Sequence, residues 1–318
     1  MKALTTISTS AVAKVEFFGD SVIDEFIASR HASDNTNRTY KNALNQLIKF
    51  FAANNISVPS EADIDGFINK LKAQKSPSTI RLYTTVTKAF FSFTARKGYF
   101  ANVAADVRLN LRKTTTHSKR ALTNQQAQKL LASVEGDNLL ARRDKAIIAL
   151  CLTCGLRTVE VSRANVGNLR DDGQGGYFLS VQGKGRLTAD AVVRVVPTVA
   201  KLIDSYLSLR GSVADDAPLF LSASNSNRGE RLGVQSVQKM IRRRLKSIGA
   251  YARRSVTPHS TRHFAATCAI RAGVDIREVS QMLRHSNLSV TTIYLHDLSV
   301  ETRTAEMRVA DSLFGGAA

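Results

Sequence analysis

Apolar residues recur at helical spacing through the first third of the chain. Within residues 36–55, Tyr40, Leu44 and Phe51 fall on one stripe, which predicts an amphipathic helix. Ser60 stands directly before an acidic first turn, as an N-cap residue does. Three further segments are expected to be helices for similar reasons: residues 21–30, 60–74 and 76–98. This part of the chain therefore predicts a compact helical bundle.

The remaining two thirds of the chain mix helical and strand patterns. YFLSV (177–181) and AVVRVV (191–196) are rich in β-branched and aromatic residues and are separated by glycine turns, so they predict strands. Helices are expected over residues 141–155, 198–211 and 234–249, and from His259 onward. Thr123 and Gln126 form a capping-box pattern, which predicts the start of a new domain.

These patterns define a mainly α protein with a small β-sheet, an α+β fold in two domains. Residues 110–122 are polar and basic and show no apolar periodicity, so we interpret them as a linker. The expected organisation is an N-terminal arm (1–17), a helical domain (18–109), the linker (110–122), a mixed domain (123–298) and a C-terminal tail (299–318).

The charge of the chain favours a polyanionic partner. Its 45 lysines and arginines exceed its 26 acidic residues, which gives a net charge of +19. Such an excess is typical of nucleic-acid-binding proteins, although a merely basic surface is the plainer explanation. We expect no membrane association, because no apolar run approaches the ~20 residues of a membrane helix. The N-terminal segment lacks the apolar stretch of a secretion signal.

The three cysteines predict a reducing compartment. Cys151 and Cys154 form a C-x-x-C pair, which can indicate redox chemistry or zinc binding. They stand within an apolar helical pattern and no second pair accompanies them, so we interpret them as buried core thiols. With Cys268 the number of cysteines is odd, and a cytoplasmic location follows.

Candidate catalytic residues are dispersed over the second domain, and each has an ordinary structural explanation. Arg157 and Glu160 can be a surface ion pair, Lys184 a solvated turn residue and Tyr294 a packed aromatic. His259 and His263 stand four residues apart, the spacing of two zinc ligands on one helix face. We expect no metal there, because Arg262 between them repels a cation and no third ligand is evident.

Taken together, these residues suit the attack of a phenol on a phosphodiester. Arg157 and Arg262 can bind the nonbridging oxygens, which gain negative charge in the transition state. His259 can accept the proton of Tyr294, and Lys184 can protonate the leaving 5′ oxygen. His285 can hydrogen-bond the nonbridging oxygens. This chemistry needs neither a metal nor a cofactor.

The motifs GLRTVE, QGKGR, HSTRH and LRHSN, with a tyrosine nine residues after His285, resemble those of the tyrosine site-specific recombinases, the phage-integrase and Xer superfamily. The resemblance spans about residues 18–311. It implies the following catalytic residues: Arg157, Lys184, His259, Arg262, His285 and Tyr294. Glu160 and His263 match supporting positions. Arg284 departs from the pattern, because the family usually has glycine there.

The resemblance also implies an activity and an assembly. The expected enzyme cleaves DNA through a 3′-phosphotyrosyl intermediate, exchanges strands through a Holliday junction and religates them without metal or ATP. Its expected partner is double-stranded DNA with an inverted-repeat core site, gripped by a C-shaped clamp in the nucleoid. We expect a homotetramer on two sites that exchanges C-terminal tails, or a heterotetramer with a paralogue.

Two other functions are compatible with the same scaffold: a catalytically silent DNA-binding protein and type IB topoisomerase-like relaxation. The motifs leave integration, Xer-type resolution, and integron or transposon roles open. Several basic residues are candidates for DNA contacts: Arg38, Lys41, Arg81, Lys88, Arg186, Arg242, Arg243 and Arg284.

Overall fold

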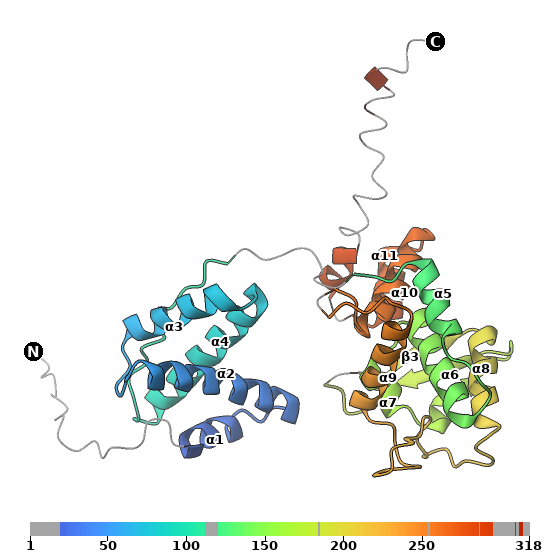
Figure 1. Cartoon of the computed structure of the whole chain (residues 1–318), viewed down its shortest axis with the longest axis horizontal. Coiled ribbons are helices and arrows are strands. Elements are labelled where there is room, and N and C mark those ends of the chain that lie inside the picture. Colours follow the sequence, from blue (N-terminus) through green and yellow to red (C-terminus); the bar gives the residue numbers. More distant parts are fainter. Residues whose placement is uncertain are drawn as a thin grey trace, which may run out of the picture. The chain divides into compact units, whose positions relative to one another are not determined.

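The protein is described here by a computed structural model, in which the chain forms two compact units, Met1–Lys113 and Thr114–Ala318 (Figure 1). The structure describes residues 20–111, 120–183, 185–253, 255–285, 287–294, 309 and 312–313. The predicted arm 1–17 lies outside these residues. So do most of the predicted linker 110–122 and most of the tail 299–318.

The N-terminal unit is a helical bundle packed around aromatic side chains. Its helices are α1 (Asp20–Ala28), α2 (Asp34–Ala53), α3 (Glu61–Gln74) and α4 (Pro77–Arg96). Phe26, Phe51, Phe67 and Phe91 are almost completely buried in its core. Ser60 is the N-cap residue, as predicted, and it forms a capping box with Asp63, whose backbone N–H donates to the Ser60 side chain.

The C-terminal unit joins helices to one small antiparallel sheet. Its elements are α5 (Asn124–Ala132), α6 (Leu139–Thr153), α7 (Thr158–Arg163), η1 (Val166–Asn168), β1 (Leu169–Asp171), β2 (Tyr177–Val181), β3 (Ala191–Val195), α8 (Pro197–Leu207), α9 (Val234–Ser247), α10 (His259–Arg271) and α11 (Ile276–Leu283). The strand order is β1-β2-β3. Leu179 pairs with Val193, and both side chains are buried, as the alternation of the strands requires.

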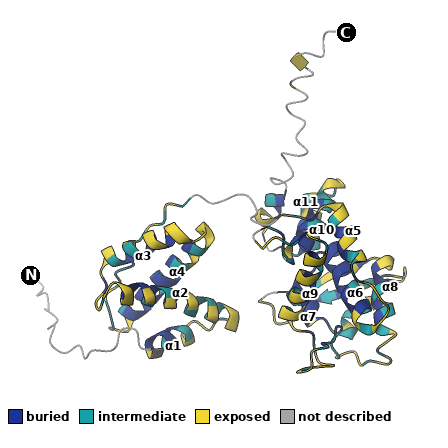
Figure 2. Ribbon diagram, in the orientation of Figure 1, coloured by how far each residue is buried: buried dark blue, intermediate teal, exposed yellow. Residues whose placement is uncertain are grey.

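Helix α6 is the central element of this unit (Figure 2). It packs against α8 and α10, and it is buried along most of its length. Cys151 and Cys154 lie at its C-terminal end as free, buried thiols, which confirms the prediction of core cysteines. Burial raises the pKa of Cys151 to about 12 and also raises the pKa of Cys154.

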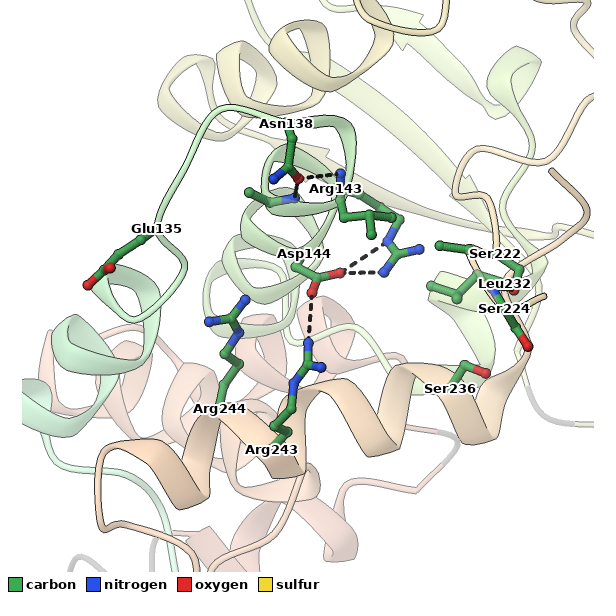
Figure 3. Close-up of a pocket in the computed structure, with 13 residues that line it drawn as sticks. Glu135, Asn138, Arg143, Asp144, Ser222, Ser224, Leu232, Ser236, Arg243 and Arg244 are labelled. Atoms are coloured by element: carbon green, nitrogen blue, oxygen red, sulfur yellow. Dashed lines mark hydrogen bonds and ion pairs between the residues drawn. The ribbon is translucent and has the colours of Figure 1, made fainter. Parts of the chain in front are cut away.

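A buried ion pair between Arg143 and Asp144 lies on α6 and contacts neighbouring elements (Figure 3). Arg143 donates to Oδ1 of Asp144 through Nε at 3.0 Å and through Nη2 at 2.7 Å. The Nη1 atom of Arg143 also donates to the carbonyl oxygen of Leu221. Arg243 of α9 approaches the second carboxylate oxygen of Asp144 at 3.8 Å. These bonds link α6 to α9 and to the loop after α8.

The predicted fold class is confirmed, and most predicted elements match. One expectation about the elements was wrong, and some short elements were not predicted. The strand β1 was not predicted, because three residues are too few to show an alternating pattern. The region from His259 onward is not continuous helix: α10 ends at Arg271, α11 follows, and residues 289–294 form a separate helical turn. Among the described residues, no helix has the length and apolar character that crossing a membrane requires.

Candidate active site

One cavity of about 550 Å³ in the C-terminal unit collects nearly all the predicted catalytic and supporting residues. Those that line it are Arg157, Glu160, His259, Arg262, His263, His285 and Tyr294. Arg284 lines it too, together with Arg186 and Asp190. Residues up to 137 positions apart in the sequence thus meet at one place. Lys184 lies outside the described residues, although its neighbour Gly183 lines the cavity.

Arg157 and Glu160 belong to the start of α7. Gly155 has a left-handed φ of +57°, which ends α6 and turns the chain, and Arg157 becomes the N-cap residue of α7. Glu160 Oε2 accepts from the backbone N–H of Arg157 at 2.8 Å, and Oε1 accepts from Arg157 Nη1 at 2.9 Å. The pair is not on the surface, because Glu160 is completely buried.

Arg262 joins two loops of the site. It extends from α10 and donates to the carbonyl oxygens of Gly155, before α7, and of Leu283, at the end of α11. Burial, followed by the charges of Arg157 and Arg284, lowers the pKa of Arg262 to about 9. An anion in the cavity would relieve this repulsion between guanidinium groups.

Arg284 points inward rather than toward solvent. Its backbone is left-handed, with φ 55° and ψ 47°, and it forms the C-cap of α11. Its Nη2 donates to Glu160 Oε2 at 2.6 Å, and its Nε donates to Oε1 at 3.3 Å. Burial would raise the pKa of Glu160, but the hydrogen bond and charge of Arg284, with smaller contributions from Arg157 and Arg262, lower it below its ordinary value.

Tyr294 lies close to two imidazole rings. Its ring centre is 5.1 Å from that of His263, edge to face, and 6.2 Å from that of His285, stacked. The tyrosine is 4% exposed and packs with Leu283 in a small apolar cluster. His259 is exposed at the first turn of α10, on the rim of the same cavity.

Sequence reasoning missed one residue that orients the site. Thr291 is completely buried, and its Oγ1 lies 2.8 Å from His285 Nδ1. The bond fixes the orientation of the imidazole ring against Tyr294. The only sequence signal was a threonine six positions after His285, which is too common to be informative.

The predicted DNA-contact residues of the N-terminal unit fall into two groups. Arg38 is exposed on α2, and Lys41 forms an exposed ion pair with Asp24. Arg81 and Lys88 instead donate to the carbonyl oxygens of Leu111 and Val107 and tie the segment after α4 to that helix.

In the C-terminal unit, Arg186 forms an exposed ion pair with Asp190, and Arg242 is exposed on α9. Arg243 combines an exposed side chain with its contact to Asp144. Arg284 differs from all of these, because its side chain is inside the site.

Comparison with known proteins decides the family. Residues 120–300 match the phage integrase family, and residues 21–100 match the N-terminal SAM-like domain of phage integrases. The chain belongs to the phage integrase family. It is a tyrosine site-specific recombinase of the Xer-like type.

Two curated relatives align with most of the chain. The chain is 28% identical to the tyrosine recombinase XerC of Thermodesulfovibrio yellowstonii over 301 residues, which cover 90% of this chain and 93% of XerC. It is 30% identical to the tyrosine recombinase XerA of Pyrococcus furiosus over 261 residues, which cover 81% of this chain and 84% of XerA.

Solved structures share the fold. The XerH site-specific recombinase bound to palindromic difH substrate superimposes with a TM-score of 0.71 at 19% identity, covering 92% of this chain and 84% of XerH. A lambda integrase dimer bound to a COC′ core site gives a TM-score of 0.63 at 16% identity, covering 86% of this chain and 76% of that one.

Proposed function

We propose that Tyr294 is the nucleophile that cleaves DNA in this recombinase. The observation that carries the proposal is the placement of Tyr294, with His263 and His285, in the cavity that Arg157 and Arg262 also line. A phenol beside two guanidinium groups is suited to attack on a phosphodiester, because the arginines bind the charge that develops on its oxygens.

The proposed reaction replaces one phosphate ester by another at each step. The hydroxyl oxygen of Tyr294 attacks the phosphorus, the bond to the 5′ oxygen breaks, and a 3′-phosphotyrosyl ester and a free 5′ hydroxyl result. The reverse attack by a 5′ hydroxyl of the partner strand restores the DNA backbone. Strand exchange through a Holliday junction then needs neither ATP nor a metal, since each ester is exchanged for another.

The proton transfers are assigned to residues at the edge of the cavity. His259 is exposed at the start of α10 and accepts the proton of Tyr294. Lys184 protonates the leaving 5′ oxygen, an assignment that rests on the QGKGR motif and on the position of Gly183 in the cavity lining. His285 hydrogen-bonds a nonbridging oxygen. Glu160 positions Arg157, and His263 packs against Tyr294.

DNA is the partner of this recombinase; the XerH structure that it resembles holds a palindromic difH substrate, and the lambda integrase structure holds a COC′ core site. The form proposed for this chain is double-stranded DNA. The proposed assembly is a C-shaped clamp around an inverted-repeat core site and a tetramer on two sites, formed by this chain alone or with a paralogue. A tail that docks on a neighbouring protomer is supported by its apolar residues, of which Val309 and Leu313 are exposed.

Covalent trapping tests the nucleophile. The protein is incubated with nicked duplexes tiled across the DNA that flanks its gene, and adducts are resolved on denaturing gels. Wild type and Tyr251→Phe should form an adduct, and Tyr294→Phe should not. Tyr251 is a matched control, because it lies in the same unit but does not line the cavity. An adduct that persists in Tyr294→Phe would overturn the assignment.

A further inference from the structure

We propose that Arg284 is a positioning residue that neutralises Glu160 and thereby leaves the charge of Arg157 available to the scissile phosphate. The inference rests on the proposed phosphate-binding role of Arg157. It concerns Arg284, which stands directly before His285 in the LRHSN motif.

The guanidinium of Arg284 is committed to the protein. Two of its nitrogen atoms contact the Glu160 carboxylate, Nη2 at 2.6 Å and Nε at 3.3 Å. Its Nη1 donates to the carbonyl oxygen of Met282 at 2.6 Å, and Nη2 also reaches that of Gly155 at 3.4 Å. A guanidinium has only five N–H groups. Four of them are therefore directed into the protein, which leaves too few to clamp a phosphate bidentately.

Arg157 holds the same carboxylate less completely. Its side chain donates to Glu160 through Nη1 alone, and the second bond comes from its backbone N–H. The side chain of Arg157 is 27% exposed, whereas that of Arg284 is 9% exposed. A buried two-point ion pair is stronger than a partly exposed single contact. When a phosphodiester enters the cavity, the side chain of Arg157, rather than that of Arg284, is thus the one that turns to bind it.

The need for a second cation follows from the burial of Glu160. A completely buried carboxylate that loses its only cationic partner pays a large desolvation cost. With Arg284 absent, Glu160 would have to retain Arg157, and its negative charge would oppose the approach of the phosphate. With Arg284 present, the carboxylate stays paired whether or not Arg157 moves.

A double-mutant cycle tests this mechanism, with single-turnover cleavage of the nicked duplex identified by trapping as the measurement. Arg284→Met should slow cleavage roughly 10- to 100-fold, the usual effect of removing a residue that holds a ligating group in place. Adding Glu160→Gln should restore most of the lost rate, because it removes the charge that holds Arg157. A double variant as slow as Arg284→Met, or slower, would overturn the proposal in favour of a direct or purely structural role.

Two further measurements separate this proposal from other failures. Arg210→Met is the matched structural control, because Arg210 also donates to backbone carbonyls, those of Pro218 and Leu219, away from the cavity. It should lower the melting temperature without changing cleavage of bound duplex. Arg284→Lys should recover part of the cleavage rate, since it restores the charge but not the two-point contact.

Inorganic phosphate provides a probe that does not depend on cleavage. It should raise the melting temperature of wild type more than that of Arg284→Met, and Glu160→Gln in the Arg284→Met background should restore the shift. If wild type forms no adduct with any duplex, the proposed function fails while this titration still tests Arg284. Equal phosphate shifts in wild type and Arg284→Met would contradict the role of Arg284.

Discussion

The side chain of Leu283 occupies the space that a side chain on Gly155 would need. A Cβ atom built on Gly155 would lie 2.7 Å from Leu283 Cδ2. The carbonyl oxygens of both residues accept hydrogen bonds from Arg262. The glycine therefore sets how closely the turn that carries Arg157 approaches the loop that carries His285.

Gly155→Ala should destabilise the protein by about 2 kcal/mol or more, because left-handed strain adds to the clash with Leu283. Gly249→Ala is the control: Gly249 has a φ of +69° but nothing within 4 Å of an added Cβ. It should cost only about 1 kcal/mol, from strain alone. Urea unfolding measures both, and equal losses would show that the Leu283 contact contributes nothing.

Asp144→Ala should be among the most destabilising single substitutions in the C-terminal unit. It leaves the buried guanidinium of Arg143 without its carboxylate (Figure 3), a loss that typically costs about 3 to 5 kcal/mol. Asp137→Ala should change stability by roughly 0.5 kcal/mol or less, because Asp137 is exposed and lies 4.0 Å from Arg142. Comparable effects in chemical denaturation would contradict a buried ion pair at Asp144.

The helices could be predicted because their signals are local. Ser60, Ser76 and Thr123 cap α3, α4 and α5 as their positions before helical patterns indicate. The strand β1 escaped prediction because its three residues become a strand only by pairing with β2. Tertiary pairing of this kind leaves no periodic trace in the sequence.

The candidate site, like the fold, was predictable only in part. The candidate catalytic and supporting residues were recognised by type and order along the chain, and all those that the structure describes line one cavity. The environment of Glu160 was not predictable, because its second partner, Arg284, is 124 residues away. An R-x-x-E spacing alone suggests a surface pair, whereas the fold buries the carboxylate between two arginines.

Thiol labelling tests the burial of the C-x-x-C pair. Native protein at pH 8 should react with Ellman's reagent at no more than one cysteine, Cys268, which is only partly buried. Burial raises the pKa of Cys151 to about 12, so it carries almost no thiolate at this pH and is also shielded from the reagent. In guanidinium chloride all three thiols should react. Cys268→Ser should abolish labelling of the native protein, and persistent labelling would contradict buried core thiols.

The pH dependence of stability should report the ion pairs of Glu160. The folded protein binds a proton at Glu160 more weakly than the unfolded chain does, because Arg284, Arg157 and Arg262 lower its pKa against the opposing effect of burial. The ionised carboxylate therefore contributes stability above its ordinary pKa of 4.5, and this contribution is lost as the pH falls through the lower folded value.

Wild type should be more stable than Glu160→Gln at pH 7, and the difference should shrink as the pH is lowered below 4.5. Glu278→Gln, which alters an exposed carboxylate on α11, should follow the wild-type curve. Melting temperatures between pH 7 and pH 3 measure the effect, and a constant gap between wild type and Glu160→Gln would show that these arginines do not hold the carboxylate in its ionised form.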